Sequence, residues 1–143
     1  VHSDAGIAVA VTKEGLLRLS QHALAVLPNL AYHDYEGIAL DLNERERLVQ
    51  DLGDKTSMLL WNHGTLAVGE TASQCWLNIF FLERACQIQV MASTQGREHL
   101  RMAPDEAIET VKVQQAATRG IGAMLAWPGC LRKLDRESPG YDT

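Results

Sequence analysis

The alternation of apolar and polar residues predicts short elements in the amino-terminal quarter of the chain. Residues 5–11 are small and apolar and stand shortly before a glycine, which is typical of a short helix with a glycine stop. Residues 16–19 and 29–35 are interpreted as short extended segments. Between them we expect a helical turn over residues 22–27, closed by Pro28.

A clearer helix begins at Asn43. Asn43 and Glu46 have the spacing of a capping box, an apolar stripe follows, and Gly53 stands where a carboxyl cap is expected. Two β-rich runs then follow, over residues 56–61 and 65–68. The Asn-His-Gly tripeptide between them favours a tight connection, so we predict a β-hairpin.

The longest predicted helix covers residues 71–94, which contain no glycine or proline. Thr71 and Gln74 have the spacing of an amino-terminal cap. The apolar residues cover more than one helix face, which indicates burial against both a sheet and a neighbouring subunit. A central helix within a single core fits the same pattern equally well. These apolar residues are Trp76, Leu77, Ile79, Phe80, Phe81, Leu82, Ile88, Val90 and Met91.

A further helix is predicted in the last third of the chain. Pro104 followed by two acidic residues is typical of a helix start, and we expect this helix to run to about Ala126. Trp127 and Pro128 should break it, with another short turn over residues 131–136. Strands interspersed with helices indicate an α/β or α+β domain with a mixed sheet.

Composition narrows the class of protein. The 143 residues fit a single domain, 1–143, and 46% hydrophobic residues are enough for a core. A net charge of −5 argues against binding of nucleic-acid backbones, and no apolar stretch approaches the roughly 20 residues that a membrane span needs. Three cysteines, an odd number without a Cys-x-x-Cys pair, fit a reducing compartment, so we expect a cytoplasmic protein.

The histidines are the residues best suited to metal chemistry. His63 lies in the predicted hairpin turn, where a neutral imidazole is held rigidly at a sheet edge, although spacing alone favours a turn histidine bonded to backbone. By itself His2 is only a terminal residue. A structural role is favoured for His33, His22 is ambiguous, and His99 is expected to be solvated.

Several strings taken together resemble the class II aldolase/adducin family. The two most specific are Leu-Leu-Trp-Asn-His-Gly-Thr-Leu-Ala-Val-Gly at 59–69 and Tyr-His-Asp-Tyr-Glu-Gly at 32–37. The likeness spans nearly the whole chain. It implies a three-layer α/β/α fold with a central, mostly antiparallel sheet, assembled as a homo-oligomer, usually a tetramer. It also implies that the amino-terminal part of the domain precedes Val1, so that the chain is the carboxyl-terminal portion.

The resemblance also implies a set of functional residues. Active members bind a divalent metal, most often zinc, through a His-x-His pair and a later histidine in a His-Gly turn. His2 matches the second member of the pair and His63 the later histidine, while the first member would precede Val1. A tyrosine near the carboxyl terminus, contributed across a subunit boundary, matches Tyr141 as the catalytic proton donor.

These expectations lead to one main function and two alternatives. The main hypothesis is a metal-dependent aldolase-type lyase that cleaves or forms a carbon–carbon bond in a small hydroxy-carbonyl compound, phosphorylated or not. The first alternative is an adducin-like, non-catalytic module for oligomerisation. The second is an epimerase or dehydratase on the same scaffold.

Overall fold

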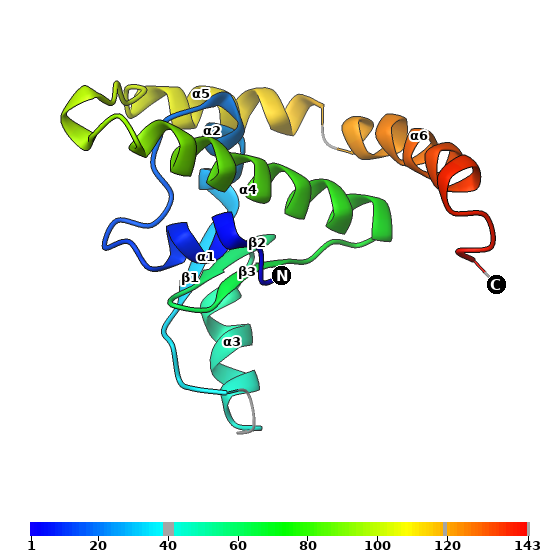
Figure 1. Ribbon diagram of the computed structural model, residues 1–143, viewed down its shortest axis with the longest axis horizontal. Coiled ribbons are helices and arrows are strands. Elements are labelled where there is room, and N and C mark those ends of the chain that lie inside the picture. The colour runs from blue at the N-terminus through cyan, green and yellow to red at the C-terminus, as the bar shows by residue number, and fades with distance from the viewer. Residues whose placement is uncertain (39–41, 119, 143) are drawn as a thin grey trace.

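The fold is built around a small mixed β-sheet with helices packed on it (Figure 1). The computed structural model describes residues 1–38, 42–118 and 120–142. Its elements are α1 (Asp4–Ala10), α2 (Gln21–Val26), a 3₁₀ turn η1 (Leu27–Asn29), β1 (Leu30–His33), α3 (Glu44–Leu52), β2 (Ser57–Leu60), β3 (Gly64–Ala67), α4 (Ala72–Ser93), a second 3₁₀ turn η2 (Arg97–His99), α5 (Glu106–Ala117) and α6 (Ile121–Glu137).

The three strands lie in the order β1-β2-β3. β2 and β3 are antiparallel, with Leu60 opposite Gly64, so the predicted hairpin is confirmed. β1 and β2 are parallel, with Leu30 opposite Ser57. The sheet is therefore mixed, which confirms the prediction made from the pattern of strands and helices. The mostly antiparallel sheet implied by the family resemblance is not what the described strands form. The reason is the connection through α3, which returns the chain to the end of the sheet where β1 began.

Helices cover both faces of the sheet. One face carries α1, α2 and α4, and Leu30 of β1 and Leu59 of β2 contribute to the core between them. Since successive strand residues point to opposite faces, Ala31 and His33 of β1 face away from that core. There α3 packs against β1, on the side of the sheet opposite α4 (Figure 1). The main core consists of Val9, Ala10, Leu16, Ala23, Val26, Leu30, Leu59, Leu82, Ala85 and Cys86.

Side-chain caps define three of the helix starts. Ser3, Ser20 and Thr71 each take an extended conformation and accept a hydrogen bond from the backbone N–H three residues later. The cap predicted at Thr71 is thus confirmed. Asn43 precedes α3 as expected but has helical angles (φ −72°, ψ −22°), so it lacks the extended backbone of a capping box.

The last two helices differ from the expectation. The expected long helix is interrupted at Gly120, which has a left-handed φ of +82°. Pro128 does not interrupt it and lies inside α6. A proline there leaves the carbonyl four residues earlier, on Met124, without its helical donor. Met124 is 64% exposed, so water can take the place of that donor. Within the described ranges, no helix is long and apolar enough to cross a membrane.

The extended segment expected at residues 16–19 forms no strand in the structure. It is a loop tied to α4 by Gln89, whose side chain accepts a hydrogen bond from Leu17 N (2.7 Å) and donates one to Gly15 O (2.8 Å). A side chain from a helix, rather than a neighbouring strand, therefore satisfies the backbone of this segment.

Candidate functional site

The hairpin turn between β2 and β3 places His63. Asn62 takes a left-handed conformation (φ +58°), and its N–H donates to Ala10 O (3.1 Å) at the end of α1. The N–H of His63 donates to Leu60 O (3.0 Å), which closes the turn. Asparagine tolerates the left-handed region better than most residues, so the Asn-His-Gly sequence suits this geometry.

The amino-terminal residues extend the sheet beyond β3 and thereby place His2. Val1 N donates to Thr65 O (2.5 Å), and Thr65 N donates to Val1 O (3.0 Å). This mutual exchange is that of an antiparallel hydrogen-bonded pair, so the residues next to it, His2 and Gly64, also lie opposite each other. Gly64 has φ +153°, and a Cβ at this position would overlap the carbonyl oxygen of Val1. Only glycine allows this close approach.

The two metal ligands expected from the sequence meet at this point. His2 Nε2 and His63 Nε2 are 2.7 Å apart, and the two rings are stacked with centroids 4.8 Å apart and an interplanar angle of 11°. The ring of Tyr35 meets that of His63 edge-on, with centroids 6.3 Å apart. Two imidazoles from distant parts of the chain thus direct their Nε2 atoms toward each other. We call His2 and His63 the histidine pair.

The donor set of the histidine pair can be tested against a divalent metal. Two imidazole nitrogens bound tetrahedrally to one zinc ion, at about 2.0–2.1 Å each, would lie about 3.3 Å apart. The observed 2.7 Å is a hydrogen-bond length, so the nitrogens need to separate by about 0.6 Å. His2 is an exposed side chain and can move by that much. Over the described part of the chain, no group of three or more His, Cys, Asp or Glu side chains is arranged to hold a metal ion. The pair fits as two ligands of a larger set.

A cleft of about 690 Å³ opens beside the histidine pair. Tyr35, which touches His63, lies on its wall, and so do Lys13 and Asp34, one cation and one anion. Trp61, also on the wall, stacks on Tyr32 with ring centroids 4.9 Å apart. Burial raises the pKa of the Tyr32 phenol, whose oxygen accepts a hydrogen bond from Leu16 N (3.3 Å). The cleft therefore has aromatic side chains in its wall and charged groups that can bind a small polar molecule.

Tyr141 lies in the tail after α6, and the carboxyl end of the chain is far from its amino end (Figure 1). Asp135 and Asp142 lie close to the phenol, and partial desolvation, followed by these two carboxylates, raises its pKa. The structure does not bring Tyr141 to the histidine pair within one chain. Its role across a subunit boundary stays a prediction, as does a metal ligand before Val1.

His33 is buried between the sheet and α3, which agrees with the structural role expected for it. Its Nδ1 lies 2.7 Å from Asp51 Oδ2, and its Nε2 lies 3.7 Å from Glu44 Oε1. Neither carboxylate stands out in the sequence as a partner of His33. The available signal was their spacing: residues seven apart on a helix lie on the same face, here the face that packs on β1.

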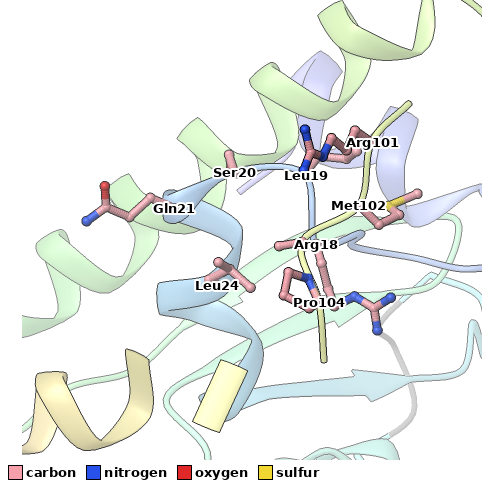
Figure 2. A pocket seen from close by; sticks show the side chains of 9 residues that line it. Arg18, Leu19, Ser20, Gln21, Leu24, Arg101, Met102 and Pro104 are labelled. Atoms are coloured by element: carbon pink, nitrogen blue, oxygen red, sulfur yellow. The ribbon is translucent and has the colours of Figure 1, made fainter. Parts of the chain in front are cut away.

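A second cleft, of about 280 Å³, lies between the start of α2 and the segment that leads into α5 (Figure 2). Arg18 and Arg101 both line it, but Arg18 is paired with Asp105. Ala103 N also donates to Arg18 O (2.9 Å). These contacts attach the segment before α5 to the rest of the fold, and no histidine lines this cleft.

Comparison with known proteins gives consistent matches. The family model described as the class II aldolase and adducin N-terminal domain matches residues 1–90. A Caulobacter vibrioides protein named "Putative aldolase class 2 protein" is 62% identical over 141 residues, which cover 99% of this chain and 55% of that protein. Mouse (Mus musculus) alpha-adducin is 43% identical over 103 residues, which cover 70% of this chain and 14% of the adducin.

A solved structure agrees closely with the fold. The crystal structure of an aldolase II superfamily protein from Pseudomonas syringae matches with a TM-score of 0.91 and 45% sequence identity, over 98% of this chain and 56% of that one. The chain therefore spans about half the length of the bacterial proteins that it matches.

Proposed function

The chain belongs to the class II aldolase and adducin N-terminal domain family, and from this premise we propose that it acts as a metal-dependent aldolase-type lyase. The substrate is a small hydroxy-carbonyl compound, phosphorylated or not, in which a carbon–carbon bond is cleaved or formed. His2 and His63 are two ligands of a divalent metal, of which zinc is the best candidate because imidazole nitrogen suits it.

The observation that carries the proposal is the convergence of the histidine pair. The two Nε2 atoms lie 2.7 Å apart, although the residues are far apart in the sequence. Backbone pairing between Val1 and Thr65 and the left-handed Asn62 turn hold both rings from independent elements. A pair of structural histidines on a surface needs neither restraint.

The chain's own residues supply binding and orientation. Each imidazole binds through Nε2 in its neutral form, and the edge-on contact with Tyr35 restricts the rotation of the His63 ring. The adjoining cleft receives the substrate, with Lys13 available to an anionic group and Asp34 to hydroxyl groups. A metal ion bound by the pair would supply Lewis acidity at the substrate's carbonyl oxygen.

Proton transfer is assigned to Tyr141 of a neighbouring subunit in a homo-oligomer, by family resemblance a tetramer. A tyrosine phenol, whose ordinary pKa is about 10, carries its proton at neutral pH and can act as a general acid. This assignment requires an assembly that brings the tail of one subunit to the cleft of another.

A second candidate function is a non-catalytic, adducin-like assembly module. It is favoured by the 43% identity to alpha-adducin over 70% of this chain. In that case the histidine pair is a structural contact at the sheet edge, and metal is not needed.

Metal content and the variant His63→Ala test the proposal. We expect the purified protein to hold a stoichiometric divalent metal by elemental analysis. Removal of one ligand should lower zinc affinity by at least about 100-fold, the upper end of what second-shell changes cost, and should abolish aldol cleavage. His99→Ala is the matched control, because the His99 side chain is exposed and its ion-pair partner is the neighbouring Glu98.

Two results would contradict the lyase. A protein without stoichiometric metal, in which His63→Ala changes neither zinc binding nor turnover, would leave the assembly module as the function. The second contradicting result would come from a panel of hydroxy-carbonyl substrates whose products are identified. Epimerisation or dehydration without cleavage would show that the chain is an epimerase or dehydratase and not a lyase.

A further inference from the structure

Glu83 of α4 connects the two segments that carry the histidine pair. Its Oε2 accepts a hydrogen bond from Ser3 Oγ, and its Oε1 accepts one from Thr65 Oγ1. Ser3 directly follows His2, and Thr65 is two residues after His63. A single carboxylate therefore fixes both backbones close to the two imidazoles.

The surrounding residues are arranged to admit this carboxylate. Ser3 Oγ accepts a hydrogen bond from Gly6 N (3.0 Å) while it donates to Glu83, so the cap of α1 and the carboxylate act on the same hydroxyl. A Cβ on Gly6 would lie 2.8 Å from Thr65 Cγ2 and 3.1 Å from Glu83 Oε1. The glycine in the first turn of α1 thus leaves room for Glu83 between the helix and β3.

The hydrogen bonds of Glu83 use both carboxylate oxygens on different segments. Hydrogen bonds to a charged acceptor are about twice as strong as those between neutral groups. If Glu83 only anchored α4, contacts with one segment would suffice. Its two contacts instead fix the amino-terminal segment relative to the hairpin, and this relative position determines the separation of the two Nε2 atoms.

We propose that Glu83 is a positioning residue that keeps the segments of His2 and His63 close enough together for both rings to bind one cation. This inference rests on the proposed metal-binding function, but the ring geometry can be measured without metal. Glu83 acts through Ser3 and Thr65 and is not itself a ligand.

The test compares Glu83→Gln and Glu83→Ala with the wild type in two measurements. Nuclear magnetic resonance of the metal-free protein reports ring-to-ring contacts between His2 and His63. Titration with zinc or cobalt(II), followed by calorimetry and by the visible spectrum of cobalt, reports affinity and coordination. We expect both variants to lose the ring contacts and to bind metal about 10- to 100-fold more weakly, as outer-shell changes do.

Glu109→Gln is the matched control, because Glu109 is an exposed helical glutamate whose partner is Lys112 on the same helix. It should behave as the wild type in both measurements. If Glu83→Ala does not fold, Glu83→Gln carries the test, since it keeps the shape of the side chain and removes the charge.

The outcomes separate the two proposals. Unchanged ring contacts and unchanged metal affinity in folded Glu83→Gln would overturn the role of Glu83, even if its melting temperature fell. A different outcome is that the wild type binds no metal while the Glu83 variants lose the ring contacts. That outcome would overturn the proposed function but would keep Glu83 as the residue that holds the histidine pair together.

Discussion

Gly64 shows how a single residue can meet two demands at once. It follows His63 in the hairpin and has φ +153°, a conformation that favours glycine. It also faces the carbonyl of Val1 so closely that any side chain would overlap it. The first demand is visible in the sequence as an Asn-His-Gly turn. The second arises only because the amino-terminal segment pairs with β3.

Cys86 allows a prediction from its ionisation. Burial, and secondly the charge of Glu83, raise its pKa to about 12 from an ordinary value of 9.0. We therefore expect iodoacetamide at pH 8 to modify Cys75 and Cys130, which are partly exposed, at least about 100-fold faster than Cys86. Mass spectrometry of the labelled peptides measures the rates.

The same shift gives a pH dependence. A thiol whose pKa is higher in the folded protein than in the unfolded chain stabilises the fold below about pH 9, and this contribution disappears as the pH rises toward 12.

In the iodoacetamide experiment, labelling in urea should reach all three cysteines equally. Equal labelling of Cys86 and Cys75 in the native protein would contradict the assignment of Cys86 as a buried thiol.

Among the secondary-structure elements, α4 contacts several different segments: the core, the amino-terminal segment and the loop at residues 15–17. Leu82, Ala85 and Cys86 belong to the main core, Glu83 reaches the segment of His2, and Gln89 holds the loop at residues 15–17. A long helix without glycine or proline can direct side chains to different neighbours because its faces are separated by fixed angles.

Gln89→Leu tests the contribution of α4 to the loop. Gln89 is 4% exposed, and its amide bonds Leu17 N and Gly15 O. Leucine would leave Leu17 N without this hydrogen bond and Gly15 O with the longer bond from Thr12 Oγ1 (3.4 Å). We therefore expect a loss of about 1–3 kcal/mol in the free energy of unfolding. Urea denaturation measures it. Gln87→Leu, on the exposed side of α4, should change stability by no more than about 0.5 kcal/mol.

For the molecule as a whole, the apolar residues on the last three helices indicate assembly. Large apolar side chains remain exposed on each of these helices, and a surface where such side chains gather is typical of a protein interface. We expect an oligomer, in which such residues are covered, with the mass of a tetramer by light scattering at micromolar concentration. A monomeric mass would contradict this and would also exclude a neighbour's Tyr141. These residues are Phe80, Met91, Val113, Ile121, Met124 and Leu125.

Local features of the fold could be predicted because they depend on neighbouring residues. The hairpin, the amino-terminal cap of α4 and the carboxyl cap at Gly53 (φ +52°) follow from turn chemistry and helix periodicity. The errors occurred where solvent exposure or a distant contact outweighs local preference. Pro128 is tolerated within α6 because the carbonyl that loses its helical donor belongs to the exposed Met124. Residues 16–19 form a loop because Gln89 provides hydrogen bonds to it.

The sequence alone predicted the hairpin and the helices up to α4, since each depends on residues close together in the chain. Through the family resemblance, it also gave His2 and His63 as candidate ligands. The strand order with its parallel β1–β2 pair, the 2.7 Å approach of the two imidazoles and the part played by Glu83 came from the folded structure. Residues 2, 63 and 83 lie on separate segments, and no local preference relates them. Val1 pairs with β3, and α4 packs against β3; these two contacts bring residues 2, 63 and 83 together.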